Sequence, residues 1–207
     1  MSSLSFNGTK IDILYKICYT DFKKYQETKM VPKEKLLLLS CCAPCSVGVI
    51  EDLKRQDVDF TVLFFNPNIQ PVEEYQKRLE ENRRICALYH VPFIDLEYTP
   101  QKWKEFVKGL ENEPEKGKRC DKCFYFRLKR TAQYAKENGY TRISSVLGIS
   151  RFKDFNQVCR AGLKVQEEEN IPYDTENWRK KGRLERSEHL SKELSLYRQT
   201  YCGCKPK

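Results

Sequence analysis

The feature that most constrains the fold of this chain is a cysteine-rich turn directly after an apolar run. Residues 36–39 are four leucines, and Ser-Cys-Cys-Ala-Pro-Cys-Ser follows at 40–46. A short apolar run bounded by a polar turn indicates a buried strand of a parallel sheet, and residues 47–54 are typical of a helix. The thiols then lie at the carboxyl edge of the sheet, where open α/β sheets hold ligands and a helix N-terminus favours thiolate. We interpret the turn as a metal-binding loop.

Strand-like and helix-like segments alternate along the chain after this turn. Further strands are predicted over residues 60–65, 91–97 and 142–147. The alternation predicts an α/β fold, a three-layer α/β/α sandwich with a mainly parallel sheet and right-handed crossovers. Ser150 is expected to cap the helix after the last strand, with Phe152 on the buried face of that helix.

The length of 207 residues suits a single domain over 1–207. We divide it into an N-terminal helix within 1–30, an α/β core over 31–170 and a basic, helical C-terminal extension over 171–207 that ends in cysteines. No apolar stretch is as long as a membrane span, and the N-terminus has no signal-peptide pattern. We therefore expect a cytoplasmic protein without a membrane partner.

The ten cysteines call for an explanation in such a compartment, where stable disulfides are rare. Cys18, Cys86 and Cys159 lie in apolar rows at helical spacing and are expected in the core. The other seven form three groups, which are Cys41, Cys42 and Cys45, then Cys120 and Cys123, then Cys202 and Cys204. Because a zinc ion or a [4Fe–4S] cluster takes four thiolates, seven favour a cluster plus a second metal, or a cluster plus a redox dithiol.

Our first choice of cluster ligands is the set at two helix starts, which comprises Cys41, Cys42, Cys120 and Cys123. Cys202-Gly203-Cys204 then closes over the site from the C-terminal tail. Two cysteines one residue apart form a strained, easily reduced disulfide, which suits redox turnover. Alternatively, Cys45, Cys202 and Cys204 hold a second iron.

A compact basic stretch near the C-terminus is the candidate RNA-binding segment. The excess of 38 Lys and Arg over 29 Asp and Glu gives a formal net charge of +9, which favours a polyanionic partner. The stretch comprises Trp178, Arg179, Lys180, Lys181, Gly182 and Arg183, and Arg127, Lys129 and Arg130 extend it. An aromatic residue among cations suits single-stranded RNA, although a solvated charge run fits the composition equally.

Together these motifs resemble the cobalamin-independent epoxyqueuosine reductases, the QueH family. The resemblance covers nearly all of residues 36–204 and is carried by Ser-Cys-Cys-Ala-Pro-Cys at 40–45, Phe-Asn-Pro-Asn-Ile at 65–69 with Glu74-Tyr75, Arg-Cys-Asp-Lys-Cys-Phe at 119–124 and Tyr-Arg-Gln-Thr-Tyr-Cys-Gly-Cys at 197–204. It implies a nucleotide α-hydrolase-like (Rossmann-like) sandwich. It also implies reduction of epoxyqueuosine to queuosine at the wobble position of the tRNA anticodon loop, with a [4Fe–4S] cluster and an adjacent iron. The family's cluster cysteines correspond to Cys41, Cys42, Cys120 and Cys123, and its C-terminal pair to Cys202 and Cys204. Some members have Asp in place of Cys45.

The implied reaction opens an epoxide to an alkene, which consumes two electrons and two protons and needs a Lewis acid on the oxygen. An open-site iron supplies the Lewis acid, and a cluster passes on single electrons from an electron donor. Candidate proton donors are Asp121 and Tyr125 beside the second cysteine group and Tyr201 beside the third. For Asp121, charge complementarity to the helix N-terminus is the competing interpretation.

Other classes of protein remain as alternatives. One is a tRNA-thiolating enzyme that uses ATP. Such an enzyme needs a Gly-rich phosphate loop after the first strand, and the Cys-Cys-Ala-Pro-Cys found there counts against ATP binding. A zinc-stabilised RNA-binding module predicts one zinc per chain and no visible absorption. A thiol–disulfide oxidoreductase does not need three cysteine groups.

Overall fold

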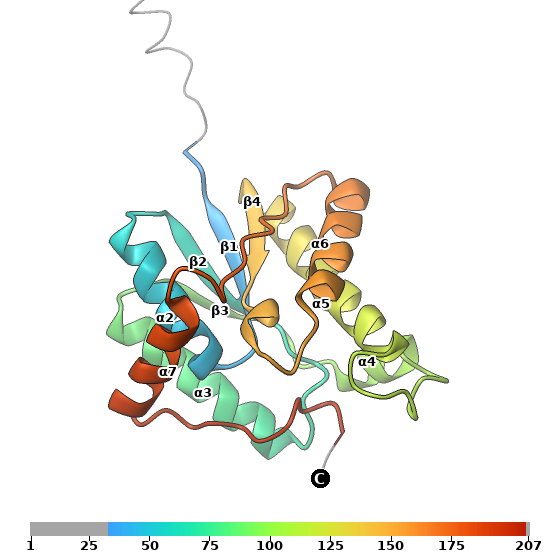
Figure 1. Ribbon diagram of the computed structural model, residues 1–207. Coiled ribbons are helices and arrows are strands. Elements are labelled where there is room, and N and C mark those ends of the chain that lie inside the picture. The colour runs from blue at the N-terminus through green and yellow to red at the C-terminus, as the bar shows by residue number, and fades with distance from the viewer. Residues whose placement is uncertain (1–32, 206–207) are drawn as a thin grey trace, which may run out of the picture. The chain divides into compact units, whose positions relative to one another are not determined.

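A four-stranded parallel sheet forms the centre of the computed structural model, which describes residues 33–205 (Figure 1). The strand order is β3-β2-β1-β4, with β1 at Leu36–Ser40, β2 at Phe60–Phe64, β3 at Phe93–Asp95 and β4 at Arg142–Ser145. The predicted N-terminal helix and Cys18 lie outside the described residues. The compact unit considered below begins at Glu34, and the single domain over 1–207 stays a prediction.

Helices cover both faces of the sheet, as the sequence predicts. The helices are α2 (Ala43–Arg55), α3 (Val72–Leu88), α4 (Pro100–Phe106), α5 (Lys118–Glu137), α6 (Phe155–Glu169) and α7 (Arg183–Glu193), with a 3-10 turn η1 (Leu147–Ile149). Helices α2, α3 and α7 lie on one side of the sheet and α5 and α6 on the other (Figure 1). Every residue of β1 and β2 is buried, as expected for parallel strands covered on both faces. The three-layer α/β/α sandwich is therefore confirmed.

The sequence places several element ends differently from the structure. Helix α2 begins at Ala43, because Pro44 occupies its first turn, so Cys45 belongs to that turn. The predicted cap at Ser150 is wrong, since the Asp154 side chain accepts hydrogen bonds from Asn156 N and Gln157 N at the start of α6. Phe152 precedes that helix and is 77% exposed, so its predicted burial is also wrong.

The C-terminal tail returns along α3 and ends beside the cysteine turn. Arg84 Nη2 donates to Leu194 O at 3.1 Å, and Tyr197 OH donates to Glu74 Oε2 at 2.6 Å. Gln70 N donates to Gly203 O at 2.8 Å. Gly203 has a φ of +105°, and a Cβ there would lie 3.1 Å from Ile69 Cγ1, so glycine permits this close approach. No described helix is long and apolar enough to cross a membrane.

Candidate metal centre

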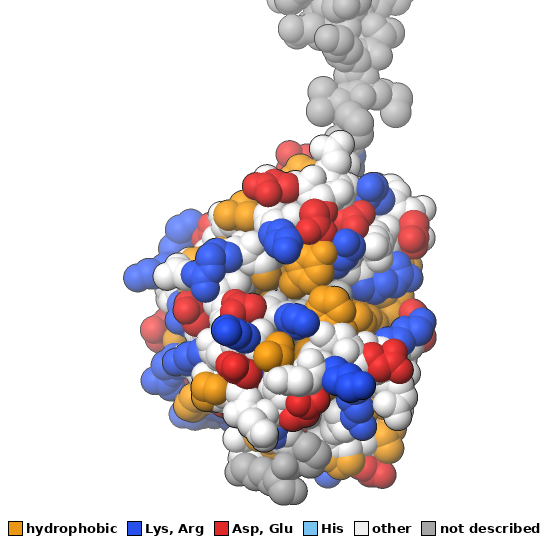
Figure 2. Space-filling model, turned by 90° about the vertical axis from the view of Figure 1, so that its right-hand side faces the viewer, with side chains coloured by type: hydrophobic (Ala, Val, Ile, Leu, Met, Phe, Trp, Pro, Cys, Tyr) orange, Lys and Arg blue, Asp and Glu red, His pale blue; other side chains and the backbone are white. Residues whose placement is uncertain are grey.

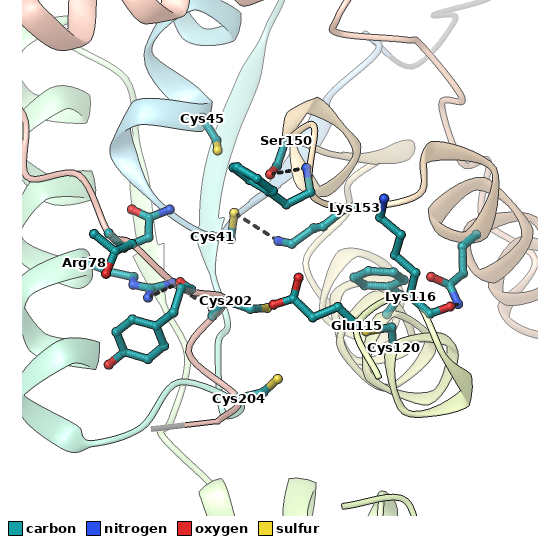
Figure 3. A pocket seen from close by; sticks show the side chains of 16 residues that line it. Cys41, Cys45, Arg78, Glu115, Lys116, Cys120, Ser150, Lys153, Cys202 and Cys204 are labelled. Carbon is teal, nitrogen blue, oxygen red and sulfur yellow. Dashed lines mark hydrogen bonds between the residues drawn. The ribbon is translucent and has the colours of Figure 1, made fainter. Parts of the chain in front are cut away.

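Cysteines from all three sequence groups line one cavity of about 330 Å³ (Figure 3). The cavity lies beyond the carboxyl end of β1, and the cysteines on its wall are Cys41, Cys45, Cys120, Cys202 and Cys204. Five thiols from a strand end, a second helix start and the tail thus share one space. The remaining two candidates, Cys42 and Cys123, are buried and do not line the cavity.

The first group is already close enough to share an ion. The sulfur atoms of Cys41, Cys42 and Cys45 all lie within 4.8 Å of one another, and those of Cys41 and Cys42 are 3.7 Å apart. Cys42 is the extended N-cap of α2, and Cys45 follows in the first helical turn, where Cys45 N donates to Cys42 O. This departure from strand geometry brings adjacent cysteines to one side, which a continuing strand would not do.

The second and third groups meet at the start of α5. Cys120 and Cys123 are three residues apart and so lie on one face of this helix. Cys123 is 7% exposed and packs in an apolar cluster with Trp103 and Val107, against which Cys204 also packs. The buried indole of Trp103 lies beside the Cys123 thiol, and its N–H lowers the pKa of that thiol against the larger effect of burial. Soft sulfur ligands with an N–H donor directed at one of them fit a metal–sulfur group.

A half-buried lysine, Lys153, lies beside the sulfur atoms most prone to carry negative charge. Lys153 Nζ lies 3.9 Å from Cys41 Sγ (Figure 3). Hydrogen bonds from Cys42 and Cys45 lower the pKa of Cys41, and Lys153 and Arg127 lower it further. A hydrogen bond from Cys204 likewise lowers the pKa of Cys202 to about 5, against the effect of burial. Burial alone would lower the pKa of Lys153, but the negative sulfurs of Cys41 and Cys202 raise it. Cys41 and Cys202 therefore favour the thiolate, the form that binds metal. Neighbouring thiols and burial raise the pKa of the other five, which are Cys42, Cys45, Cys120, Cys123 and Cys204.

A buried polar network holds the first two cysteine groups in register. Arg127 of α5 donates to Phe65 O at 3.1 Å and to Asn66 Oδ1, and Asn66 Nδ2 donates to Ser40 O at 2.9 Å. Arg127 is 2% exposed, so the expectation that it extends an RNA-binding surface is wrong. Its charge faces the sulfurs instead, as its effect on the pKa of Cys41 shows.

The tail is fixed by a buried ion pair on α3. Arg78 Nε donates to Glu74 Oε1 at 2.7 Å, and its terminal nitrogens donate to the carbonyl oxygens of Cys202 and Tyr201, each at 3.0 Å. Gln199 Nε2 approaches Cys42 Sγ at 2.8 Å. Sequence reasoning missed Arg78, Gln199 and Lys153, because only the Glu74–Arg78 spacing of four residues gave any sign of a contact.

Two of the candidate proton donors do not reach the cavity. Each residue of a helix is rotated by about 100° around the axis from the one before. Asp121, one residue after Cys120, and Tyr125, five residues after it, therefore project away from the face of Cys120. Asp121 is exposed and is not among the lining residues. Tyr125 OH donates to Glu168 Oε2 at 2.6 Å and belongs to a different cavity. Tyr201 does line the cysteine cavity, although its hydroxyl donates to Gln70 O at 3.1 Å.

The basic stretch serves mainly as a structural connection. Trp178 is 4% exposed, and the Arg183 guanidinium lies 4.9 Å from its ring centroid. Arg183 also donates to Asp52 Oδ2 at 2.5 Å and to Glu176. The expected stacking of Trp178 on a base is therefore wrong, because its ring is covered. Lys180 and Lys181 are exposed, so a role in RNA binding stays a prediction for them.

Burial of Trp178 leads to a prediction that separates stability from RNA binding. Trp178→Ala is expected to lower the free energy of unfolding by about 3–5 kcal/mol, measured by urea denaturation, because it empties a packed core site. The matched double change of Lys180→Ala and Lys181→Ala leaves stability within about 0.5 kcal/mol, as exposed substitutions do. Equal stability of Trp178→Ala and the parent protein would contradict the buried placement.

The charge of the protein is not gathered into one patch on the face over α5 and α6. Lys and Arg alternate there with Asp and Glu around a central group of hydrophobic side chains (Figure 2). Net charge alone therefore does not locate a nucleic-acid surface on this face.

Comparison with known proteins gives one consistent family. The family model described as epoxyqueuosine reductase QueH matches residues 36–205. The chain is 48% identical over 171 residues to epoxyqueuosine reductase QueH from Histophilus somni, covering 82% of this chain and 70% of that protein. It is also 48% identical over 172 residues to the protein of that name from Acinetobacter baylyi, covering 83% and 79%.

Solved structures resemble this one at the level of the fold. The U34-tRNA thiolase NcsA from Methanococcus maripaludis with its [4Fe-4S] cluster has a TM-score of 0.53 and 12% identity, covering 93% of this chain and 70% of that one. A predicted subunit of a tRNA methyltransferase from Methanocaldococcus jannaschii gives the same TM-score and identity, covering 77% and 75%. These likenesses agree with the expected nucleotide α-hydrolase-like sandwich.

Proposed function

This chain belongs to the epoxyqueuosine reductase QueH family, and from that premise we propose that it reduces epoxyqueuosine to queuosine in tRNA at the cysteine cavity. The family match carries the activity. We place the reaction at this cavity because thiols from three distant segments meet there. An oxidoreductase that transfers single electrons to a bound nucleoside needs a redox group of this kind in reach of solvent.

The proposed cofactor is a [4Fe–4S] cluster held by Cys41, Cys42, Cys120 and Cys123. We further propose that Cys45, Cys202 and Cys204 hold an additional iron, with a Cys202–Cys204 disulfide as the alternative use of the tail. When bound, this group supplies low-potential electrons and a Lewis acid for the epoxide oxygen. The overall change takes the epoxide, two electrons and two protons to an alkene and water.

The residues around the sulfurs have distinct roles in this proposal. Lys153 places a cation beside Cys41, which offsets the negative charge of the thiolates and favours electron uptake. Arg127 and Asn66 hold the two helix starts at a fixed separation. Tyr201, on the cavity wall, is the remaining candidate to deliver a proton. An electron donor outside the chain completes the reaction.

Arg78 gives a test of the tail as part of the site. Arg78→Gln is expected to free residues 201–204, since it removes two charge-assisted hydrogen bonds worth about 1.5–3 kcal/mol each. We expect faster proteolysis of the tail and at least about tenfold slower turnover, with the cluster absorbance retained. Arg78→Lys keeps the positive charge and is the matched control. Its rates of tail proteolysis and of turnover are expected to lie between those of the parent protein and of Arg78→Gln. A variant tail as resistant as that of the parent protein would show that Arg78 does not fix it.

The activity itself is tested with modified tRNA. Anaerobically reconstituted protein is incubated with epoxyqueuosine-containing tRNA and dithionite, and the tRNA is then digested for nucleoside analysis. The proposal predicts conversion of epoxyqueuosine to queuosine that requires both protein and reductant. Unchanged epoxyqueuosine with a fully reconstituted protein would contradict it.

A further inference from the structure

The short loop between η1 and α6 presents an exposed aromatic ring at the edge of the cysteine cavity. Phe152 is 77% exposed, more than any other large hydrophobic side chain among residues 33–205. It lines the cysteine cavity and also a smaller neighbouring cavity of about 100 Å³. A partner that covers this ring removes apolar surface from water, which favours binding.

The loop is held in place rather than left free. Arg179 Nη2 donates to Lys153 O at 2.6 Å and to Ser150 O, so one guanidinium joins both ends of the turn. Lys153 N donates to Ser150 O at 3.1 Å, and Phe152 N donates to Ser150 Oγ at 3.3 Å. A ring presented from a fixed turn loses little freedom when it binds, which favours affinity. Arg179 was expected from the sequence to contact RNA, but its guanidinium instead holds the turn that carries Phe152.

Cations line the same two cavities as the ring, together with the carboxylates of Glu115 and Glu188. Lys116 is exposed on the wall of the cysteine cavity, and Arg151 and Arg198 are exposed on that of the neighbouring cavity. Arg151 also forms an ion pair of 3.1 Å with Glu188, and its side chain stays 70% exposed. An aromatic ring among cations is the pattern by which proteins bind single-stranded nucleic acid, with bases stacked on the ring and phosphates near the charges.

We propose that Phe152 is the stacking platform for an unpaired base of the tRNA anticodon loop, next to the nucleotide that enters the cavity. This inference rests on the proposed function and adds the surface through which the RNA is held. The Phe152 ring binds one flanking base, and Lys116, Arg151 and Arg198 lie near the adjoining phosphates. Phe152 touches the substrate outside the reacting atoms, so its contribution is to binding and not to the chemical step.

The first test compares Phe152→Ala with Phe152→Trp and with Leu88→Ala, an exposed apolar control on α3 that is 53% exposed. Dissociation constants for tRNA are measured by anisotropy at fixed salt, together with kcat and KM. Phe152→Ala is expected to raise Kd and KM about 10- to 100-fold with kcat and the visible spectrum nearly unchanged. Phe152→Trp and Leu88→Ala stay within about threefold of the parent protein. Parent-like tRNA affinity of Phe152→Ala, or a loss confined to kcat, would overturn the proposal.

The second test identifies the stacked base by a double-mutant cycle. Anticodon stem-loops are prepared with an abasic residue on the 5′ or the 3′ side of the modified nucleotide, and Kd is measured for the parent protein and Phe152→Ala. One abasic RNA is expected to bind the parent protein more weakly but to cause no additional loss with Phe152→Ala. Fully additive effects at both positions would overturn the stacking. Since binding is measured without turnover, a parent protein that binds tRNA and reduces nothing would count against the proposed function alone.

Discussion

Cys120→Ser is expected to remove both the visible absorption of the reconstituted protein and its turnover, whereas Cys159→Ser leaves both intact. Cys120 lies in the first turn of α5 and lines the cavity opposite Cys41 and Cys45. Cys159 lies on α6 and is not among the residues that line the cavity. A cluster of four irons needs four thiolates, so loss of one protein ligand leaves an open, labile corner. The measurement is iron and sulfide content with absorbance, followed by nucleoside analysis.

The same experiment distinguishes the proposed ligand set from its competitor. Iron is expected to fall from at least about four atoms per chain toward zero in Cys120→Ser. Retention of all iron and absorbance in this variant would contradict the assignment. The close triad of Cys41, Cys42 and Cys45, together with a tail cysteine, would then be the ligand set to test.

The second large effect concerns the tail, where Cys202→Ala and Cys204→Ala are each expected to abolish turnover while the cluster absorbance stays. Both residues line the cavity, but they come from a segment that docks on α3 and not from the helix starts. Tyr201→Phe, which removes only the hydroxyl that donates to Gln70 O, is the neighbouring comparison for the proton-donor role. Turnover near the parent rate in either cysteine variant would contradict a role for the tail.

Metal and thiol content separate the two uses of the tail cysteines. If they hold an additional iron, each variant loses about one iron and keeps about four. If they form a redox disulfide, iron content is unchanged, and the oxidised parent protein shows two fewer free thiols than the reduced one.

The arrangement of the sheet and the meeting of the cysteine groups followed from local sequence. The leucine run before Cys41 indicates a doubly covered strand, and Cys120 lies in the first turn of a helix expected at the same sheet edge. The carboxyl edge of a parallel sheet is shared by all its strands, so these two turns were expected to converge. The path of Cys202 and Cys204 along α3 depends on Arg78 and Glu74, and local pattern does not reveal such contacts between distant segments.

Residues were misassigned where their partners lie far away in sequence. Trp178 and Arg183 look like a basic RNA-binding loop, but Asp52, which is 131 positions from Arg183, makes this segment part of the buried structure. Asp121 and Tyr125 are adjacent to cysteines in sequence and yet project from other sides of α5. Lys153 and Phe152 do not belong to a recognisable sequence motif. They lie beside the cavity because Arg179 fixes the short turn that carries them.

The most direct test of the account is the metal and sulfide content of anaerobically purified protein, read together with its visible and EPR spectra. The three convergent cysteine groups predict about four acid-labile sulfides and four or five irons per chain, a broad absorption and a signal on reduction that is typical of a [4Fe–4S] cluster. A colourless protein with one zinc and no sulfide would contradict the account.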